Sequence, residues 1–322
     1  MNTIRWGMIG CGSVTEVKSG PGFQKAEGSQ LVAVMRRNGA LAQDYAKRHG
    51  VPRWYDNAQD LIDDPEVDAV YIATHPDTHK DYAIQVAKAG KPVYCEKPLG
   101  RTLQESQEMV SFCKAQGIPL FSAYYRRALP KYLLVKKLIE EGILGNIRFV
   151  NLLMYQTIKE DDINPSWRVN PTISGGGRFL DVGSHSLDLL DWLCGPIQSV
   201  QGQATNQAKT NSAEDIVSGS WVHSNGVHGT GIWCFNTFKD EDVIALYGSK
   251  GMLAFSVLDL EAPLTIDTGK GIETLAVPLP PEHVAQPLIQ TVVNQLLNKG
   301  ICPSTGESGM RTDWVMKQLQ GL

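Results

Sequence analysis

Three features are scarce in this sequence of 322 residues: an excess of charge of one sign, cysteines at paired spacings, and long apolar runs. The formal net charge is only -4 and no basic block occurs, so the electrostatic footprint of a nucleic-acid-binding protein is missing. The six cysteines follow neither metal-binding nor disulfide spacings, which is typical of thiols in a reducing cytoplasm. The N-terminal residues lack the pattern of a signal peptide, and no run is long enough to span a bilayer. We therefore expect a cytoplasmic protein that binds neither nucleic acid nor membranes.

The chain does contain enough apolar residues to build a large core. Hydrophobic residues make up 42% of it and charged residues 20%, and its length favours two domains. In the first 123 residues, apolar runs of strand type alternate with segments of helical character. The expected strands are Ile4–Ile9, Leu31–Met35, Ala69–Ala73, Pro92–Tyr94 and Ile118–Ala123. This alternation predicts a parallel sheet with right-handed crossovers.

After about Arg148 the pattern changes to strand-type runs joined by Gly, Asn, Asp and Ser, with one helix expected near Asp181–Leu193. Such a pattern is typical of a largely antiparallel sheet with one face covered by helices. The expected fold is therefore α/β. A doubly wound parallel sheet is predicted in residues 1–123, and an α+β domain with an open, mostly antiparallel sheet in residues 124–322.

A glycine-rich turn follows the first expected strand. Gly10 and Gly12 match the first two glycines of the dinucleotide-binding pattern G-x-G-x-x-G, and Thr15 takes the place of the third. The first glycine permits the tight turn, and the second lets the backbone approach a pyrophosphate at a helix N-terminus. Thr15 predicts looser packing of that helix, and Gly20–Gly22 predicts that it is short or irregular. Because the turn follows the first strand, a dinucleotide site is favoured over a simple strand-to-helix turn.

The end of the second expected strand bears on which dinucleotide binds. An acidic residue there hydrogen-bonds the ribose hydroxyl of NAD, whereas an arginine accommodates the phosphate of NADP. Here Arg36 and Arg37 follow Met35 and no carboxylate is present. Two guanidinium groups suit a phosphate, so NADP is favoured over NAD, and a solvated strand end is the alternative.

Polar residues also follow the third expected strand. Thr74 and His75 are placed to line a cofactor site at the carboxyl edge of the sheet. Thr78 is placed to cap the next helix, and His79 in its first turn is more typical of a packing residue than of a catalyst.

Glu96, Lys97 and Pro98 directly follow the fourth apolar run, Pro92–Cys95, at the same predicted edge. A lysine there would be partly desolvated, which lowers the pKa of an amine and suits it to donate a proton or stabilise an oxyanion. From this segment alone, a surface lysine after a strand is equally consistent.

A second cluster stands far downstream. Asp181, His185 and Asp188 are spaced i, i+4 and i+7, so in a helix all three lie on one face, and Gly175–Gly177 precede them. A histidine with a carboxylate one turn before it suits general acid–base chemistry. A core helix with a satisfied histidine is the alternative. A metal site is disfavoured, because no cysteine or further histidine stands at a suitable spacing.

Together these segments resemble the glucose-fructose oxidoreductase/inositol dehydrogenase family, often called Gfo/Idh/MocA. Glu-Lys-Pro and Asp-x-Gly-x-His-x-x-Asp are the more specific elements, and the glycine turn is the less specific one. The resemblance implies a Rossmann N-terminal domain and a C-terminal domain that binds substrate. It also implies a homo-oligomer, a dimer or tetramer, assembled through the open C-terminal sheet.

The resemblance further implies catalytic roles. Lys97 would sit between the nicotinamide and the substrate, Asp181 would bind or orient the substrate hydroxyl, and His185 would exchange its proton. A cis peptide bond between Lys97 and Pro98 is also implied.

Cofactor-binding residues are carried over in the same way. Arg37 resembles the family's arginine after the second strand, and Trp167 and Arg168 resemble a Trp-Arg pair that lines the active site in some members. The full expected cofactor-binding set is Gly10, Gly12, Ser13, Val14, Arg36, Arg37, Thr74, His75, His79, Glu96, Lys97, Trp167 and Arg168.

The expected activity is hydride transfer between NADP(H), or alternatively NAD(H), and the CH-OH or C=O carbon of a sugar, polyol or related diol. Two other functions stay open, because one scaffold serves many functions. One is an NAD-dependent glycosidase that oxidises its substrate only transiently, and the other is a non-catalytic dinucleotide sensor.

Overall fold

The computed structural model describes residues 2–163 and 166–321, which form two compact units. The first unit comprises the chain up to Leu129 together with Pro281–Met310, and the second comprises Pro130–Pro280 together with the residues from Arg311 on. The expectation of one boundary at residues 123/124 differs from this division, because the chain passes between the units after Leu129, Pro280 and Met310.

The first unit contains a parallel sheet of six strands in the order β3-β2-β1-β4-β5-β6, which is the order of a doubly wound dinucleotide-binding fold. The predicted parallel sheet is confirmed. Its central strand β4 is buried along its whole length, as expected where helices cover both faces. The strands are β1 (Ile4–Ile9), β2 (Ser29–Met35), β3 (Arg53–Tyr55), β4 (Ala69–Ile72), β5 (Val93–Cys95) and β6 (Leu120–Ser122).

Helices connect these strands, and local signals explain several of their ends. The Asn38 side chain accepts the Leu41 N–H at the start of α2, and Gly50 with φ of +64° ends that helix. Thr102 caps α5 in the same way as Asn38 caps α2. The helical segments are η1 (Thr15–Ser19), α1 (Gly20–Lys25), α2 (Gly39–His49), α3 (Ala58–Asp63), η2 (Pro76–Thr78), α4 (His79–Lys88), α5 (Leu103–Ala115), η3 (Tyr125–Ala128) and α10 (Gln286–Leu296).

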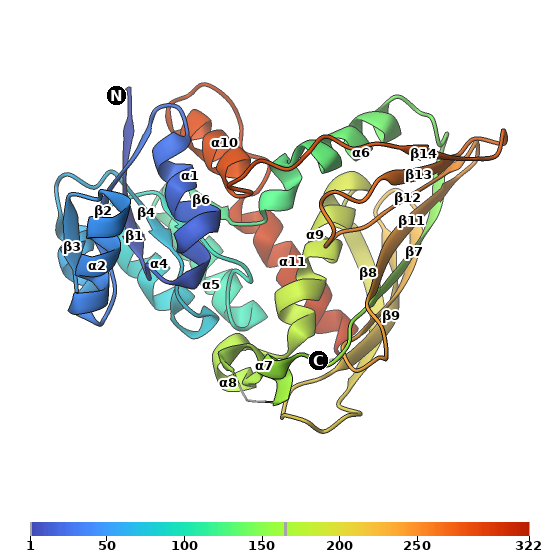
Figure 1. Cartoon of the computed structure of the whole chain (residues 1–322), viewed down its shortest axis with the longest axis horizontal. Coiled ribbons are helices and arrows are strands. Elements are labelled where there is room, and N and C mark those ends of the chain that lie inside the picture. The colour runs from blue at the N-terminus through green and yellow to red at the C-terminus, as the bar shows by residue number, and fades with distance from the viewer. Residues whose placement is uncertain (1, 164–165, 322) are drawn as a thin grey trace. The chain divides into compact units, whose positions relative to one another are not determined.

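Helix α10 explains why the segment after Pro280 belongs to the first unit. It lies beside α1 (Figure 1), and its apolar side chains Leu288, Ile289, Val292 and Val293 are buried. A Cβ atom on Gly22 would lie 3.0 Å from Ile289, so this glycine lets the two helices approach closely.

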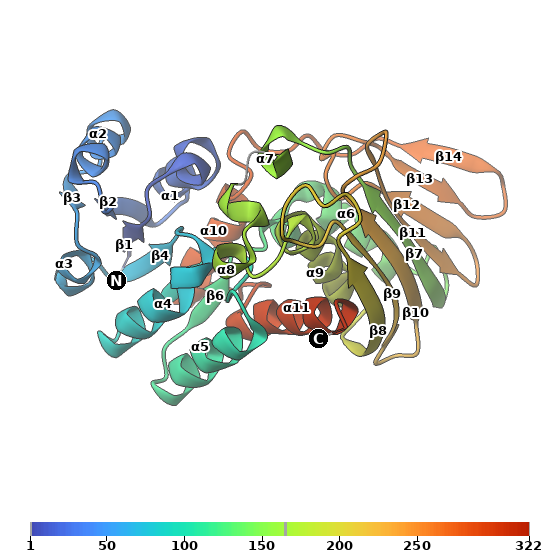
Figure 2. The ribbon, with the colours of Figure 1, turned by 90° about the horizontal axis from the view of Figure 1, so that it is seen from below.

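The second unit contains an eight-stranded sheet in the order β14-β13-β12-β11-β7-β10-β9-β8, drawn side by side in Figure 2. Among the strand pairs of the described residues in this sheet, only β7 and β10 run parallel, so the predicted mostly antiparallel sheet is confirmed. The strands are β7 (Ile147–Tyr155), β8 (Ile197–Thr205), β9 (Ile216–His223), β10 (His228–Cys234), β11 (Glu241–Gly248), β12 (Met252–Phe255), β13 (Leu264–Asp267) and β14 (Ile272–Leu275).

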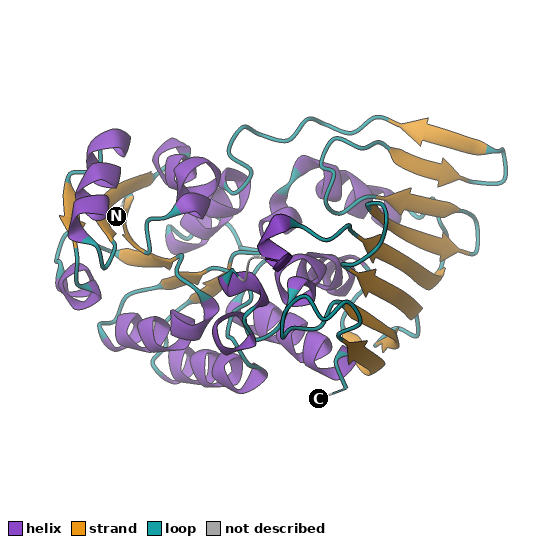
Figure 3. Cartoon of the chain, turned by 60° about the horizontal axis from the view of Figure 1, so that its bottom comes forward, coloured by secondary structure: helices purple, strands orange, loops and turns teal. Residues whose placement is uncertain are grey.

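Within the second unit, helices pack on one face of this sheet, and Figure 3 shows its strands in orange. Along β7, the buried Val150, Leu152 and Met154 alternate with more exposed residues, the period-two pattern of a sheet with one covered face. The helical segments are α6 (Pro130–Glu140), α7 (Glu160–Ile163), η4 (Trp167–Val169), α8 (Pro171–Ser174), η5 (Phe179–Gly183), α9 (Ser184–Leu193) and α11 (Gly306–Leu319), of which α11 begins in the first unit.

Among the helices of the described residues, none combines the length and apolar character that crossing a lipid bilayer requires.

Candidate active site

The glycine turn follows β1 at the carboxyl edge of the parallel sheet. Gly10 has φ of +94°, and a Cβ atom there would lie 2.9 Å from the Ala73 carbonyl, so only glycine fits. A Cβ atom on Gly12 would meet only the Gly10 carbonyl at 3.8 Å, which leaves open space above the turn. Ser13 is exposed and Val14 precedes the helical turn η1. The turn thus has the backbone conformation and the room that a pyrophosphate requires.

The prediction that Thr15 loosens the packing after this turn is wrong. Thr15 is buried, its hydroxyl donates to the Gly12 carbonyl at 2.8 Å, and its own carbonyl accepts the Tyr45 hydroxyl at 2.9 Å. A Cβ atom on Gly20 would overlap the Tyr45 hydroxyl and the Thr15 carbonyl, so Gly20 provides the close packing expected of the third glycine. The predicted irregular helix is confirmed, since η1 is a π-helical turn that precedes the short α1.

Arg36 and Arg37 directly follow β2 and both are exposed. The positive charge of Arg36 acts on the Cys11 thiol of the glycine turn, although burial dominates and raises the pKa of that thiol to about 11. The Gly10 and Cys11 N–H groups donate to the Met35 carbonyl at 2.9 Å and 3.2 Å, so Arg36, the next residue, lies at the turn. The Asn38 side chain accepts the Leu41 N–H as the cap of α2, whereas Arg36 and Arg37 are both exposed at this strand end.

Thr74, His75 and His79 lie after β4, in three different environments. Thr74 is half-buried and accepts the Thr78 hydroxyl at 2.8 Å, while His75 is exposed. The prediction that Thr78 caps α4 is wrong, because no side-chain cap bond forms there and its hydroxyl contacts Thr74 and the His75 carbonyl instead.

His79 is fully buried, as a packing residue would be. One ring nitrogen lies 3.0 Å from the Pro98 carbonyl and the other 3.1 Å from the Thr74 carbonyl. Burial lowers the pKa of His79, which favours the neutral ring. His79 thus connects the loop after β4 with the loop after β5 and has no surface through which to contact a cofactor directly.

Glu96 and Lys97 directly follow β5, at the same edge as the glycine turn. Glu96 is buried and Lys97 is half-buried. The Glu96 N–H donates to the Ile72 carbonyl at 2.9 Å, which extends the pairing of β4 with β5. The predicted cis peptide bond between Lys97 and Pro98 is confirmed.

In the second unit, Asp181 and His185 lie on consecutive helical turns. Asp181 belongs to the π-helical turn η5 and His185 to the first turn of α9. Gly183 stands at their junction, where a Cβ atom would lie 2.7 Å from the Phe179 ring and 3.0 Å from the Trp233 ring. The Ser186 hydroxyl accepts the Trp233 N–H at 3.0 Å, so α9 is held firmly on the sheet.

Asp188 has a different environment from Asp181. It is 1% exposed and its carboxylate accepts the Thr312 hydroxyl of α11 at 3.4 Å, whereas the Asp181 side chain is 23% exposed. The predicted common face therefore does not give the three residues a common role, because α11 covers Asp188. The π-helical turn also changes the angular relation between residues 181 and 185.

Trp167 and Arg168 form a small cluster with Asp181. The Arg168 guanidinium lies 4.7 Å from the centre of the Trp167 ring and 3.2 Å from the Asp181 carboxylate. Arg168 thereby orients Asp181 within the second unit.

Two acidic residues, the buried Asp162 and the half-buried Glu214, support the loops that carry this cluster. Asp162 pairs with Arg178 at 2.7 Å, and Glu214 accepts the Gly177 N–H at 2.9 Å. Burial raises the pKa of Glu214. Gly177 has no room for a side chain because the Glu214 backbone lies against it, which explains part of the glycine run.

The parallel sheet, the glycine turn and the Glu-Lys-Pro segment at its carboxyl edge define a nicotinamide-dependent oxidoreductase. The model for the oxidoreductase family with an NAD-binding Rossmann fold matches residues 4–124, and the GFO/IDH/MocA C-terminal domain model matches residues 132–254. The chain belongs to the GFO/IDH/MocA family.

Several known proteins resemble it along most of its length. Oxidoreductase P35 of Formosa agariphila is 37% identical over 99% of this chain and 98% of its own. The 1,5-anhydro-D-fructose reductase of Ensifer adhaerens is 26% identical over 95% of this chain and 92% of its own. A levoglucosan dehydrogenase, solved with NADH and levoglucosan, shares the fold with a TM-score of 0.88 and 24% identity over 98% of this chain and 96% of its own.

Sequence reasoning missed Tyr71 of β4, whose hydroxyl donates to Glu96 at 2.6 Å. No local signal could have found it, because β4 is buried on both faces and its apolar run shows no alternation.

Proposed function

We propose that this oxidoreductase transfers a hydride between NADP(H) and the CH-OH or C=O carbon of a sugar, polyol or related diol. The main support is the half-buried Lys97, which follows β5 at the edge where the glycine turn offers an open phosphate site. Relatives named as an anhydrofructose reductase and a levoglucosan dehydrogenase favour a sugar-like substrate.

The bound nicotinamide would supply the hydride acceptor or donor. In our proposal the Lys97 ammonium donates a hydrogen bond to the substrate oxygen and stabilises charge that develops on it. Asp181, oriented by Arg168, accepts a hydrogen bond from a substrate hydroxyl. His185 exchanges the proton of the reacting hydroxyl, a role that suits an imidazole near neutral pH.

For the cofactor we propose a preference for NADP(H) over NAD(H). Arg36 and Arg37 are exposed at the end of β2, and their planar guanidinium groups are suited to a phosphate on the ribose. Gly10, Gly12, Ser13 and Val14 would contact the pyrophosphate, and Thr74 and His75 the neighbouring part of the dinucleotide.

We also propose that the second unit binds substrate and assembles a dimer or tetramer through the uncovered face of its sheet. On that face Phe149 is 45% exposed, and its ring stacks on the Tyr247 ring with 4.5 Å between the ring centres. Light scattering of the purified protein should give a dimer or tetramer, and a Phe149→Glu variant should shift it toward the monomer. A wild-type monomer at micromolar concentration would contradict this part of the proposal.

The cysteines support a reducing location, since all six are buried thiols. We propose the cytoplasm as that location.

An absorbance assay tests the proposed activity. The purified protein is mixed with NADPH, NADP, NADH or NAD and with a panel of 1,5-anhydro-D-fructose, levoglucosan, aldoses, ketoses, inositols and aryl diols. We expect cofactor oxidation or reduction with at least one compound, at higher kcat/KM with the phosphorylated cofactor. Sugar release without net absorbance change would indicate the glycosidase, and tight dinucleotide binding with no turnover would indicate the sensor.

A further inference from the structure

A buried tyrosine contacts the carboxylate that precedes Lys97. Tyr71 lies in β4 and is fully buried, and its hydroxyl donates to Glu96 Oε1 at 2.6 Å. The second oxygen, Oε2, accepts the backbone N–H of Lys97 at 3.3 Å. Both oxygens of Glu96 therefore contact groups of the first unit.

The same tyrosine also contacts the helical turn after the glycine turn. Ser19, the last residue of η1, is 1% exposed and its hydroxyl oxygen lies 3.2 Å from the Tyr71 oxygen. Because a phenol has one proton, which Tyr71 gives to Glu96, Ser19 donates to Tyr71. Burial raises the pKa of Tyr71 well above its ordinary value, so the phenol keeps its proton.

Aromatic neighbours hold the Tyr71 ring in place. The ring centres of Phe23 and Tyr94 lie 5.0 Å and 5.1 Å from that of Tyr71, and all three residues are buried. Buried rings in contact have little rotational freedom. The position of the Tyr71 hydroxyl is therefore set by the core.

We propose that Tyr71 is a positioning residue for Lys97, acting through the Glu96 carboxylate. The hydrogen bonds run from Ser19 to Tyr71, from Tyr71 to Glu96, and from the Lys97 backbone to the other Glu96 oxygen. These hydrogen bonds join η1, the helical turn that follows the residues proposed to bind the pyrophosphate, to the lysine proposed to act on the substrate. The inference rests on the proposed function of Lys97.

Removal of the phenol hydroxyl would leave the Glu96 carboxylate without its strongest donor. The carboxylate would then rotate, and the Lys97 backbone would lose its fixed acceptor. A misplacement of a reacting group by about 1 Å costs up to roughly a hundredfold in rate. Dinucleotide affinity would change little, because Glu96 is buried with both oxygens engaged within the first unit, and the ribose and pyrophosphate are assigned above to other residues.

The test compares Tyr71→Phe with Tyr94→Phe, which removes a second buried hydroxyl from the same aromatic cluster. With the best compound of the panel, Tyr71→Phe should lower kcat by roughly tenfold or more and leave the KM of NADPH within about twofold. Tyr94→Phe should keep kcat within about twofold. The proposal is overturned if Tyr71→Phe keeps the wild-type kcat, or if both variants lose kcat equally.

A double-mutant cycle with Glu96→Met keeps the inference testable if Tyr71→Phe also lowers stability. In the Glu96→Met background, Tyr71→Phe should change kcat by less than about twofold, because the carboxylate through which it acts is gone. If Tyr71→Phe lowered kcat by the same factor in the Glu96→Met background as in the wild type, the proposal would be overturned. A Lys97→Met variant with wild-type kcat would instead show that Lys97 does not have its proposed function. This outcome differs from an unchanged kcat in Tyr71→Phe, which would contradict only the positioning role of Tyr71.

Discussion

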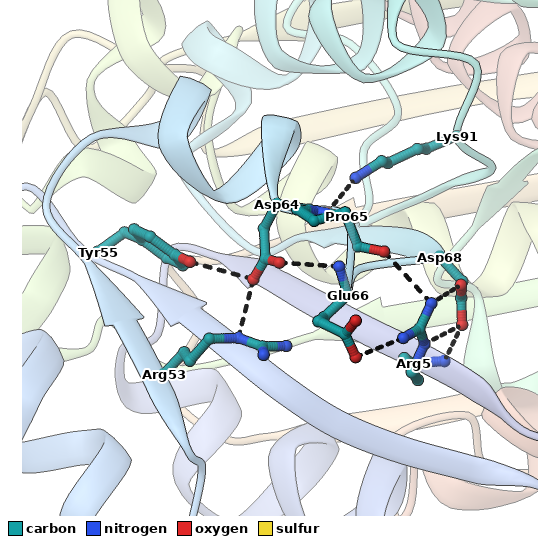
Figure 4. Close-up of polar contacts among 8 residues, drawn as sticks. All are labelled: Arg5, Arg53, Tyr55, Asp64, Pro65, Glu66, Asp68 and Lys91. Carbon is teal, nitrogen blue, oxygen red and sulfur yellow. Dashed lines mark hydrogen bonds and ion pairs between the residues drawn. The ribbon is translucent and has the colours of Figure 1, made fainter.

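The two edges of the parallel sheet in the first unit differ in how they use polar residues. At the carboxyl edge, buried side chains such as Tyr71, Glu96 and His79 contact loop backbone and each other, and they support the proposed active-site residues. At the amino edge, charged side chains pair with one another across strand ends (Figure 4). The Arg5 guanidinium binds Asp68 at 2.7 Å and Glu66 at 2.6 Å.

Asp64 is the centre of the second group at the amino edge, also drawn in Figure 4. Its side chain is only 6% exposed, and its carboxylate pairs with Arg53 at 2.9 Å and accepts the Tyr55 hydroxyl at 3.1 Å. Its backbone carbonyl accepts Lys91 Nζ at 2.7 Å. These bonds join β3 and the segment before β5 to the loop before β4, so they contribute to stability.

The difference suggests a division of function between the edges. Open parallel sheets bind ligands at the carboxyl ends of their strands, so the amino ends are available for stabilising contacts. Changes at the carboxyl edge should therefore reduce turnover, and changes at the amino edge should reduce the free energy of unfolding.

The largest effect is expected for Lys97→Met. Because the ammonium that stabilises the substrate oxygen is lost, kcat should fall by roughly a thousandfold while NADPH affinity stays within a few-fold. Steady-state kinetics and NADPH fluorescence titration measure both quantities.

Lys91→Met is the matched control, since Lys91 precedes β5 and Lys97 follows it. We expect it to keep kcat within about twofold and to lower only stability. Equal losses of turnover in the two variants would remove the proposed division between the edges.

Asp64→Ala should have the second largest effect, on stability. It removes a buried carboxylate and leaves Arg53 and the Tyr55 hydroxyl without their acceptor, which should cost about 3 kcal/mol of the free energy of unfolding. Urea unfolding measures this loss, and kcat should stay within about twofold of the wild type. A large loss of kcat in the folded variant would contradict the proposed division of function between the two edges of the sheet.

A smaller effect is expected for Arg36→Ala and Arg37→Ala on cofactor choice. Loss of a charge-assisted hydrogen bond to the ribose phosphate should weaken NADPH binding by roughly tenfold and leave NADH binding unchanged. Titration calorimetry with both dinucleotides tests this. An equal loss for NADPH and NADH would assign the arginines to the adenine rather than to the phosphate.

The smallest effect is expected for Glu16→Gln, at an exposed ion pair after the glycine turn. The hydrogen bond from Arg48, with help from His49, lowers the pKa of Glu16 from its ordinary 4.5 to about 2. A carboxyl with a lowered pKa stabilises the fold above its unfolded pKa and loses this contribution as pH falls through the folded value.

The stability difference between wild type and Glu16→Gln should therefore be constant above about pH 4.5 and shrink toward pH 2. Because the pair is solvent-exposed, the difference should stay below about 1 kcal/mol. Urea unfolding across this pH range measures it, and a difference that grows at low pH would contradict the assignment.

Local patterns predicted much of the fold and those candidate site residues that lie in the first unit. The alternation of strands and helices predicted the parallel sheet, and the resemblance to the family implied the cis bond after Lys97. The short edge strands β3 and β14 were not predicted, because a three-residue strand and a strand with every residue exposed carry little hydrophobic pattern.

Long-range packing explains the remaining differences. Asp188 matched the helical spacing of Asp181 and His185, but Thr312, more than a hundred residues later, contacts it and α11 covers it. The tight packing around Thr15 depends on Tyr45 and Gly20, so the glycine pattern alone was misleading. Contacts of this kind follow from the assembled fold and leave no local signal.

Isotope transfer tests the proposed activity most directly. The wild-type enzyme is incubated with NADPH carrying deuterium on the transferred C4 position and with the best carbonyl compound of the panel, and the product is analysed by mass spectrometry. The account predicts one deuterium on the new carbinol carbon, and none when Lys97→Met replaces the wild type. Turnover that leaves no deuterium in the product would contradict hydride transfer from the nicotinamide.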